Sequence, residues 1–359
     1  MLYLILAPLK DVWIGFNLFR YITFRAFCGG ALTIILVLLL GRKTISFIKK
    51  KNFIQPVKNF MPQNHLKKSV PTMGGILIVF SSLISFLLFA DLTNRYIILG
   101  ILSFVAFAIL GFFDDYYKIK RKKGMAIKTK LILESLIAIF LIIFLYFWAE
   151  NKELRGITQV LFFKNIIINF KWFYLIVAFI FIIIVSNAVN FTDGLDGLAS
   201  GLIAISSGVY GVLAYCGGNF KIANYLNLLY IKEIGELSIF ALILMGACLG
   251  FLWFNAHPAE IFMGDVGSLP LGMMLGYLAL ASKQEMLFIF AGGVFVVEFF
   301  SVLLQVLYFR LTKGKRIFLM APLHHHYELK GEKEEKIVVR FWIMGSLLGI
   351  MALASLKIR

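Results

Sequence analysis

The sequence is poor in charge and in cysteine, and both shortages narrow the class of protein. Only 15% of the 359 residues are charged and 60% are hydrophobic, a balance outside the usual range of soluble globular domains. The three cysteines, Cys28, Cys216 and Cys248, are widely scattered and match neither a disulfide framework nor a zinc-ligand spacing. We interpret them as small apolar side chains within helices. These counts argue against a disulfide-rich secreted fold and against a cysteine-based metal centre.

Long apolar segments make up most of the chain. Each is long enough to cross a hydrocarbon core of about 30 Å as a helix, and backbone groups in lipid must be satisfied within helices or closed barrels. We predict an all-α polytopic membrane protein with about ten transmembrane helices, at residues 19–40, 73–90, 96–113, 129–148, 172–190, 198–215, 236–255, 267–282, 286–310 and 339–356. No low-complexity linker or evident internal repeat divides the chain, so residues 1–359 should form a single integral membrane domain.

Two segments outside the regular spans carry their own expectations. Met1–Asn17 lacks the charged start and the small-residue cleavage site of a signal peptide, so we expect a short arm at the membrane interface. The loop Glu150–Trp172 mixes charged and apolar residues and should form a small hairpin or a surface helix.

Acidic residues are scarce as well, with 19 Asp and Glu against 36 Lys and Arg and a formal net charge of +17. Most of the loop Lys and Arg residues follow the odd-numbered predicted spans. By the positive-inside rule these loops face the cytoplasm, which places both termini outside, in the periplasm. Such loops attract anionic lipid headgroups and can also concentrate an anionic soluble substrate. The net charge therefore requires no nucleic-acid partner.

Five of the seven aspartates fall just past the ends of predicted spans, all on the predicted cytoplasmic face: Asp114, Asp115, Asp193, Asp196 and Asp265. The adjacent pair is poorly placed at a helix C-terminus, because charges about 5 Å apart repel by roughly 3 kcal/mol at an effective dielectric near 20. A cation, nearby lysines or protonation of one member must offset this repulsion. Two interpretations stay open: ion pairs with Lys118 or Lys120, or a role in catalysis or metal binding.

The loop Asn187–Gly197 carries a second group of polar residues. Asn190, Asp193 and Asp196 recur every three residues, so they share one face if the last turn of the helix continues. Amides and carboxylates in this arrangement can bind ribose hydroxyls and a base edge, or help to hold a cation. The alternative is that the two aspartates cap the following helix.

The loop Asn255–Ser268 carries a third group. Asp265 lies at the start of the eighth predicted span, at or just before its N-cap. Phe262 is an aromatic residue among polar neighbours, available to stack on a base, with packing into the core as the alternative.

A histidine triplet, His324-His325-His326, follows the ninth predicted span. Consecutive histidines seldom all reach one ion, and zinc favours mixtures of imidazole and thiolate, although no cysteine lies nearby. The many carboxylates favour a hard cation instead, because Mg2+ uses one or two carboxylates, several waters and phosphate oxygens. We interpret the triplet as a phosphate contact, with zinc binding or an incidental polar turn as alternatives.

The ninth predicted span itself contains Gly292-Gly293, Glu298 and Gln305, and we predict that it bends. Polar groups at this depth should face protein or water. A secondary transporter is the main rival function, but transporters place polar residues near the bilayer midplane, often in duplicated halves. Here the carboxylates gather at one interface, which favours an enzyme over a transporter or a purely structural scaffold.

The motifs taken together resemble those of the polyprenyl-phosphate N-acetylhexosamine-1-phosphate transferase superfamily. The likeness covers essentially the whole chain and rests on Pro71–Gly75, Phe112–Lys118, Asn187–Gly197, Ala259–Ser268 and Pro322–Glu328. The uninterrupted run Leu323-His324-His325-His326 resembles the bacterial cell-wall branch that acts on a muramoyl-pentapeptide. Relatives that use other sugar nucleotides tend to interrupt this run, and a transferase of N-acetylglucosamine 1-phosphate is the alternative within the superfamily.

This resemblance implies a Mg2+-dependent phosphoglycosyl transferase of the bacterial cytoplasmic membrane. The reaction would move phospho-MurNAc-pentapeptide from UDP-MurNAc-pentapeptide to undecaprenyl phosphate, giving lipid I and UMP, the first membrane step of peptidoglycan synthesis. The active site would lie on the cytoplasmic face, a groove along the ninth span would admit the isoprenoid, and the enzyme would be a homodimer.

The resemblance also implies roles for single residues. Asp265 would hold the Mg2+, with Asp193 as a further candidate ligand, and Asp114 would deprotonate or position the lipid phosphate with support from Asp115. His324 completes the catalytic set. The implied substrate-binding residues are Asn190, Asp193, Gly194, Leu195, Asp196, Asn255, Phe262, His325, His326, Lys67, Thr72, Lys130 and Gln305, with Lys68 and Lys128 as competing lysines. Direct attack by the lipid phosphate is favoured over a covalent enzyme intermediate.

Overall fold

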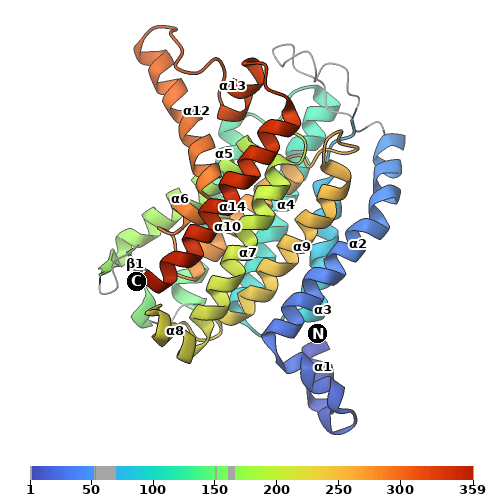
Figure 1. Ribbon diagram of the computed structural model, residues 1–359, viewed down its shortest axis with the longest axis vertical. Helices are drawn as coiled ribbons and strands as arrows, with labels where there is room; N and C mark the ends of the chain where they lie inside the picture. The colour runs from blue at the N-terminus through green and yellow to red at the C-terminus, as the bar shows by residue number, and fades with distance from the viewer. Residues whose placement is uncertain (1, 52, 54–69, 150–151, 161–165, 359) are drawn as a thin grey trace.

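The computed structural model describes residues 2–51, 53, 70–149, 152–160 and 166–358. The described chain is a bundle of long helices with very little sheet, as predicted (Figure 1). Within the described residues, eight helical segments are long and apolar enough to cross a membrane, at Ile22–Lys50, Arg95–Arg121, Ile127–Trp148, Lys171–Thr192, Leu198–Gly218, Ile234–Asn255, Gly293–Leu311 and Glu334–Lys357. Two shorter apolar helices, Gly75–Phe89 and Asp265–Ala281, match the remaining predicted spans. The number of ten crossings, and which side of the membrane each end faces, stay predictions.

The long helices carry the labels of Figure 1. They are α2 (Ile22–Lys50), α3 (Gly75–Phe89), α4 (Arg95–Arg121), α5 (Ile127–Phe144), α6 (Tyr174–Thr192), α7 (Leu198–Gly218), α9 (Leu237–Asn255), α10 (Asp265–Ala281), α12 (Gly293–Leu311) and α14 (Glu334–Ile358). The short helices are α1 (Leu2–Leu6), α8 (Phe220–Leu226), α11 (Phe288–Ala291) and α13 (Leu323–Leu329). Short 3-10 and π turns link several of them.

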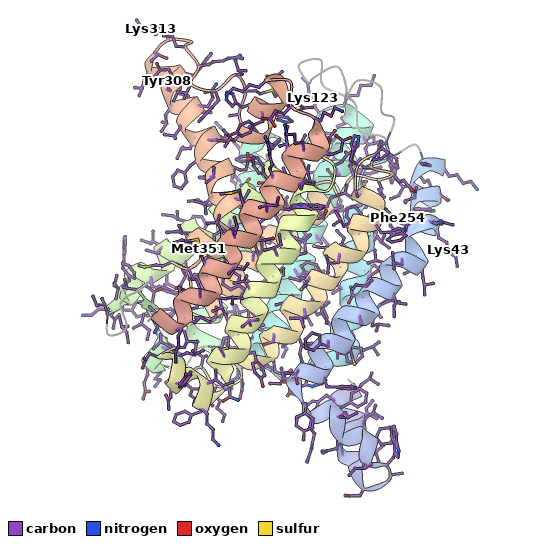
Figure 2. The ribbon with its side chains drawn as sticks, in the orientation of Figure 1. Lys43, Lys123, Phe254, Tyr308, Lys313 and Met351 are labelled. Carbon is purple, nitrogen blue, oxygen red and sulfur yellow. The ribbon has the colours of Figure 1, made fainter. Side chains whose placement is uncertain are left out.

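The centre of the bundle is formed by α7, α9 and α10. Every residue of α10 is buried, and the apolar windows of α7 and α9 are 78% and 72% buried, against 22% for α12 and 28% for α14. The outer helices therefore expose apolar side chains, as helices facing lipid do. Figure 2 shows α12 projecting from the bundle, with Tyr308 and Lys313 near its far end.

Two glycines allow the close approaches that build the site end of the bundle. A Cβ on Gly111 would lie 2.2 Å from the main-chain oxygen of Asp265, so α4 and α10 meet backbone to backbone there. Gly264, with φ of +72°, adopts a conformation that L side chains rarely accept, and it turns the chain into α10. These contacts bring the C-terminal end of α4 against the first residue of α10.

The ninth predicted span, the loop after α5 and the two termini each had an expected form or position. The ninth predicted span breaks between α11 and α12 at Gly292, which confirms the predicted bend. The loop after α5 forms an antiparallel hairpin of β1 (Ile157–Gln159) and β2 (Ile167–Asn169), one of the two forms expected. Both termini lie in the half of the bundle away from α13 (Figure 1).

Candidate active site

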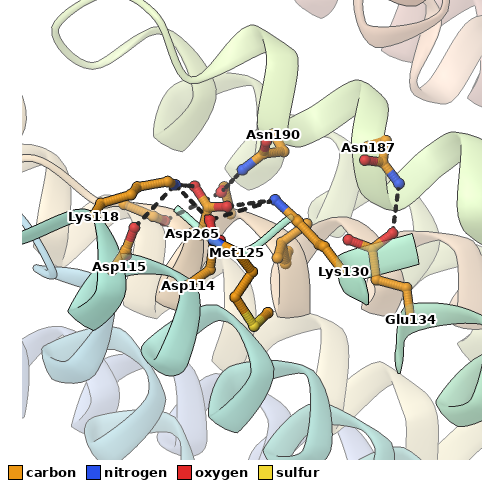
Figure 3. A network of polar contacts seen from close by, with 12 residues as sticks. Asp114, Asp115, Lys118, Met125, Lys130, Glu134, Asn187, Asn190 and Asp265 are labelled. Carbon is orange, nitrogen blue, oxygen red and sulfur yellow. Dashed lines mark hydrogen bonds and ion pairs between the residues drawn. The ribbon is translucent and has the colours of Figure 1, made fainter. Parts of the chain in front are cut away.

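The candidate site lies where the ends of α4 and α6 meet the beginnings of α5 and α10 (Figure 3). Asp114 and Asp115 lie near the end of α4 and are each 2% exposed. Asp265 is the first residue of α10, and Lys130 lies in the first turns of α5. Carboxylate oxygens of Asp114, Asp115 and Asp265 lie within 4.8 Å of one another. We call these three residues the aspartate cluster.

Two lysines neutralise most of the charge of the aspartate cluster. The Nζ atom of Lys118 lies 2.8 Å from Asp114, 3.3 Å from Asp115 and 2.6 Å from Asp265. The Nζ atom of Lys130 lies 2.5 Å from Asp265 and 3.9 Å from Asp114. The ion pair proposed from the sequence is therefore formed by Lys118, which one helical turn places beside both neighbouring carboxylates. Of the two lysines considered, Lys120 instead lies near the hydroxyl and ring of Tyr116.

Backbone amides fix the orientation of two of the carboxylates. The N–H of Met125 donates to Oδ1 of Asp114 at 2.7 Å, and the N–H of Val266 donates to Oδ2 of Asp115 at 3.1 Å. Each of these carboxylates therefore has one oxygen held by the backbone and another turned toward Lys118. This arrangement positions oxygen ligands in advance, which suits a hard divalent cation that keeps waters and phosphates as its other ligands.

Asp193, directly after α6, belongs to the same electrostatic environment. Burial raises the pKa of Asp193 to about 7, with a further contribution from the negative charges of Asp265 and Asp115. Lys118 and a hydrogen bond from the backbone of Gly264 act in the opposite direction. Among the described residues, Asp193 is not part of the aspartate cluster, whose carboxylate oxygens lie within 4.8 Å of one another.

The amide of Asn190 reaches the same region from α6. Its Nδ2 donates to Oγ of Ser268 at 2.7 Å, on the first turn of α10. One turn earlier on α6, Asn187 donates to the buried carboxylate of Glu134 at 2.8 Å (Figure 3). These contacts tie α6 to α5 and α10 and hold the loop that carries Asp193.

The histidine triplet splits into separate environments. His324 is fully buried, and Glu298 of α12 accepts its backbone N–H at 3.2 Å and faces its Nδ1 at 3.2 Å. The Nε2 atom of His324 is buried and has no hydrogen-bond partner within the described part of the chain. It lies against the loop after α6, because a Cβ on Gly194 would be 2.3 Å from it. His324 is thus positioned with a ring nitrogen available beside the predicted substrate loop.

The other two histidines contact different partners. Nδ1 of His325 lies 3.0 Å from Glu328, one turn along α13. Nδ1 of His326 accepts the N–H of Leu319 at 3.1 Å, and burial is the main factor that lowers the pKa of His326. Gln305 accepts from Ile317 and Phe318 of the same loop, so His326 and Gln305 both shape the connection between α12 and α13.

Thr72 and Phe262 border the aspartate cluster. The hydroxyl of Thr72 is buried and has no hydrogen-bond partner among the residues that the structure describes. A Cβ on Gly264 would lie near both that hydroxyl and Asp115, so Thr72 lies next to the cluster. Phe262 is half-buried. Its backbone hydrogen bonds with Pro71 and Gly74 hold the loop before α10 against the segment before α3.

The remaining predicted binding residues lie mainly within loop contacts. Asn255 donates to the carbonyl of Ile261 at 2.9 Å and accepts from Ser200 at 3.1 Å. Leu195 is buried, and Asp196 faces His257 and the backbone of Ala259. Lys67 and its competitor Lys68 lie outside the described residues.

Sequence reasoning overlooked Glu298 as a partner of His324, and it overlooked Ser268 and the contact between Glu134 and Asn187. One signal could have found Glu298, because a carboxylate inside a lipid-facing helix needs a polar partner in the protein. The pairing of Asn190 with Ser268 gives no comparable signal, because it depends on how α6 packs on α10.

Comparison with known proteins defines first the class and then the family. Residues 96–283 match the model of glycosyl transferase family 4, so the bundle and its site are those of a membrane-embedded transferase of this class. Curated relatives from Desulfotalea psychrophila, Thermodesulfovibrio yellowstonii and Rickettsia prowazekii are 49%, 47% and 45% identical, each over 100% of both chains. All three are named phospho-N-acetylmuramoyl-pentapeptide-transferase. The chain belongs to the phospho-N-acetylmuramoyl-pentapeptide transferase family, which confirms the resemblance found in the motifs.

Proposed function

We infer that this chain transfers phospho-MurNAc-pentapeptide from UDP-MurNAc-pentapeptide to undecaprenyl phosphate in the bacterial cytoplasmic membrane, giving lipid I and UMP. The observation that carries the proposal is the aspartate cluster with Lys118 and Lys130 at one end of the bundle. The names of full-length relatives support the muramoyl donor over UDP-N-acetylglucosamine. The position of the carboxylates at helix ends argues against transport, which would favour the middle of the bundle.

We propose Mg2+ as the cofactor, held by Asp265 with the neighbouring cluster oxygens. The all-oxygen donor set fits this ion, and its chemistry there would be to neutralise charge on the pyrophosphate of the donor. Lys118 and Lys130, which now pair with Asp265, have the reach to bind phosphate oxygens of either substrate. Asp193 remains a candidate second ligand, supported by its electrostatic coupling to Asp265.

Asp114 is the proposed residue that accepts a proton from, or orients, the lipid phosphate, with Asp115 beside it. An oxygen of the lipid phosphate attacks the phosphorus attached to the sugar, the bond between the two phosphates breaks, and UMP leaves. Phosphoryl transfer depends on in-line positioning and charge neutralisation more than on covalent chemistry by the protein. The hydrogen bond that the backbone N–H of Met125 donates to Asp114 supports this role, because it fixes the direction of the carboxylate.

Two unpartnered polar atoms indicate where substrate oxygens would bind. Among the described residues, neither Nε2 of His324 nor the hydroxyl of Thr72 has a hydrogen-bond partner, although both are buried, a costly condition unless a ligand satisfies them. We assign phosphate or sugar oxygens to them. The uridine moiety would lie along the loop of Asn190, Asp193 and Asp196, with Phe262 as the stacking surface.

The test is UMP release by purified protein in detergent, with both substrates and with or without Mg2+. Release that requires Mg2+ and both substrates supports the proposal. Offering UDP-N-acetylglucosamine in parallel separates the two donors, and release with that donor alone would contradict the muramoyl assignment. Rapid-quench mass spectrometry that finds a phosphosugar attached to an aspartate would overturn direct attack.

We also propose a homodimer, which sedimentation of the detergent-solubilised protein would confirm or exclude.

A further inference from the structure

Glu134 is a buried carboxylate that the proposed mechanism does not use. It lies on α5 and is fully buried, and its Oε2 accepts a hydrogen bond from Nδ2 of Asn187 at 2.8 Å. The same Nδ2 donates to the carbonyl of Ile183 at 3.0 Å, so both N–H groups of that amide are engaged. One of the two oxygens of Glu134 therefore holds the side chain against α6.

The second oxygen of Glu134, Oε1, is buried and has no hydrogen-bond partner among the described residues. This condition is costly, because the oxygen has lost its contact with water and no donor replaces it. Protonation would not remove the cost, since a buried O–H would then need an acceptor. We therefore looked for a group that can reach Oε1 in another state of the site.

Lys130 is the cation placed to do so. It lies one helical turn before Glu134 on α5, a spacing that puts two side chains next to each other on one face of a helix. Figure 3 shows Lys130 between Asp265 and Glu134, with Nζ 2.5 Å from Asp265. No ion pair joins Lys130 to Glu134 within the part of the chain that the structure describes. The charge of Lys130 nevertheless acts on Glu134 from a greater distance.

A cation at Asp265 would compete with the ammonium group of Lys130, because both are positive and both use the same carboxylate. The side chain of Lys130 is only 17% exposed, and a largely buried charge that loses its partner is strongly destabilising. A lysine has a flexible four-carbon stem. Rotation within this side chain can therefore turn Nζ from Asp265 toward Glu134 without movement of the backbone.

We propose that Glu134 is a positioning residue that receives Lys130 when a divalent cation binds Asp265. The inference rests on the proposed function, since it takes the cation to bind at the aspartate cluster. Glu134 accepts one N–H of the ammonium group and keeps it beside the site, where the remaining N–H groups can bind phosphate oxygens. Glu134 itself touches neither the substrate nor the cation. Its unpartnered oxygen marks the second of two positions for one ammonium group.

The experiment measures affinity for Mg2+ without any substrate. Full-length protein in detergent is stripped with a chelator, and the rise of Tm with added Mg2+ gives the affinity of the folded state. Glu134→Gln keeps the shape of the side chain and an oxygen for Asn187, but it removes the charge. The competing ammonium then has no second partner, so Mg2+ binding should weaken by about 10-fold, the lower end of the effect of a hydrogen bond to a charged group.

A double-mutant cycle with Lys130→Met separates positioning from a purely structural role. Lys130→Met alone removes the competitor and should tighten Mg2+ binding. In that background, Glu134→Gln should weaken binding by much less than 10-fold, because no ammonium remains to be received. If Glu134 only held α5 against α6, its substitution would lower Tm in metal-free buffer and change Mg2+ affinity equally in both backgrounds.

Two further variants assign the measured affinity. The dependence of Tm on Mg2+ should disappear in Asp265→Asn. Glu332→Gln makes the same change of charge in a side chain that pairs with Lys336 and Arg340, and it should bind Mg2+ as the wild type does. The Tm of each variant without metal establishes that it is folded.

Equal Mg2+ affinity in the wild type and Glu134→Gln, or additive effects in the cycle, would overturn the role of Glu134 and leave the proposed reaction untouched. Unchanged Mg2+ affinity in Lys130→Met would show that the ammonium group does not compete, which overturns the proposal without reference to any Glu134 variant. Folded wild-type protein that binds no Mg2+ would overturn the cofactor assignment, and this inference with it.

Discussion

The aspartate cluster and a second group, formed by Asp196, His257 and Glu334 and here called the histidine cluster, both bring buried carboxylates together, yet they balance the charge differently. In the aspartate cluster, two lysines pair with Asp265 and one of them contacts all three carboxylates. In the histidine cluster, the partner is the imidazole of His257, fixed at both ring nitrogens. Lysines on flexible stems can leave their carboxylates for a phosphate, whereas a ring held at two points cannot. The first arrangement suits groups that change partners during turnover, and the second suits a fixed contact between loops.

Substitution of Asp265 tests the catalytic role of the aspartate cluster and should lower turnover more than any other change considered. Asp265→Asn removes the charge that pairs with both lysines and would bind the cation. We expect UMP release to fall by on the order of a thousandfold, in protein that elutes and melts as a folded species. Glu332→Gln is the control, because Glu332 pairs with Lys336 and Arg340 and does not belong to the aspartate cluster. It should leave the rate near that of the wild type. Near-normal turnover in Asp265→Asn would remove this residue from the mechanism.

Loss of the contact between Glu298 and His324 should lower turnover less than loss of the Asp265 carboxylate. Glu298 would act on the substrate only through the ring of His324. Glu298→Gln replaces a carboxylate that receives two backbone N–H groups and faces the ring of His324. Hydrogen bonds to charged groups contribute about 1.5–3 kcal/mol, so turnover should fall by roughly 10- to 100-fold. If Glu298 only stabilises the fold, Tm will fall while the rate of the folded fraction is unchanged. Steady-state UMP release and Tm, measured on the same preparation, distinguish these outcomes.

Loss of Lys118, the lysine shared by the three carboxylates, should also lower stability. Lys118→Met keeps most of the side-chain volume but leaves three carboxylates with Lys130 alone. Removal of one partner from a largely buried ion pair costs about 3 kcal/mol, so Tm should drop by several degrees without divalent cation. Added Mg2+ should recover part of the loss, because it replaces the missing positive charge. An unchanged Tm in metal-free buffer would show that Lys118 does not offset the repulsion within the cluster.

A further expected effect is a change in how stability depends on pH. The folded chain keeps Asp193 protonated up to about pH 7, whereas an unperturbed aspartate releases its proton near 3.8. The folded state therefore binds more protons between these values, and stability falls as pH rises through that window. Asp193→Asn should flatten the dependence of Tm on pH between about 4 and 7 in metal-free buffer. Parallel curves for the variant and the wild type would contradict the raised pKa.

The membrane class could be predicted from the sequence, and so could the position of the aspartates at the ends of spans, for a clear physical reason. Hydropathy and length identify helices in lipid almost independently of their neighbours, and span ends set which loops share a face. The positions of Asp114, Asp193 and Asp265 at span ends follow from this. Their shared environment does not, because it depends on the close packing of α4 on α10 at Gly111.

Side-chain partners were the part that could not be predicted. Asp196 and His257 are 61 residues apart and come together only through the packing of three loops. The histidine triplet looked uniform in sequence, but its members bond to Glu298, Glu328 and Leu319 on different sides of α13. Such pairings depend on helix rotation and loop path, which hydrophobic pattern and residue type do not specify.

The backbone contact between Gly111 and Asp265 has a mechanical consequence for an enzyme that works inside a bilayer. Membranes change thickness and lateral pressure, and helices that pack through long side chains can slide and tilt in response. Two main chains in direct contact leave little room for such movement. The separation between the main chains that carry the carboxylates of α4 and of α10 is therefore set by van der Waals contact, and should stay constant while the lipid around it changes.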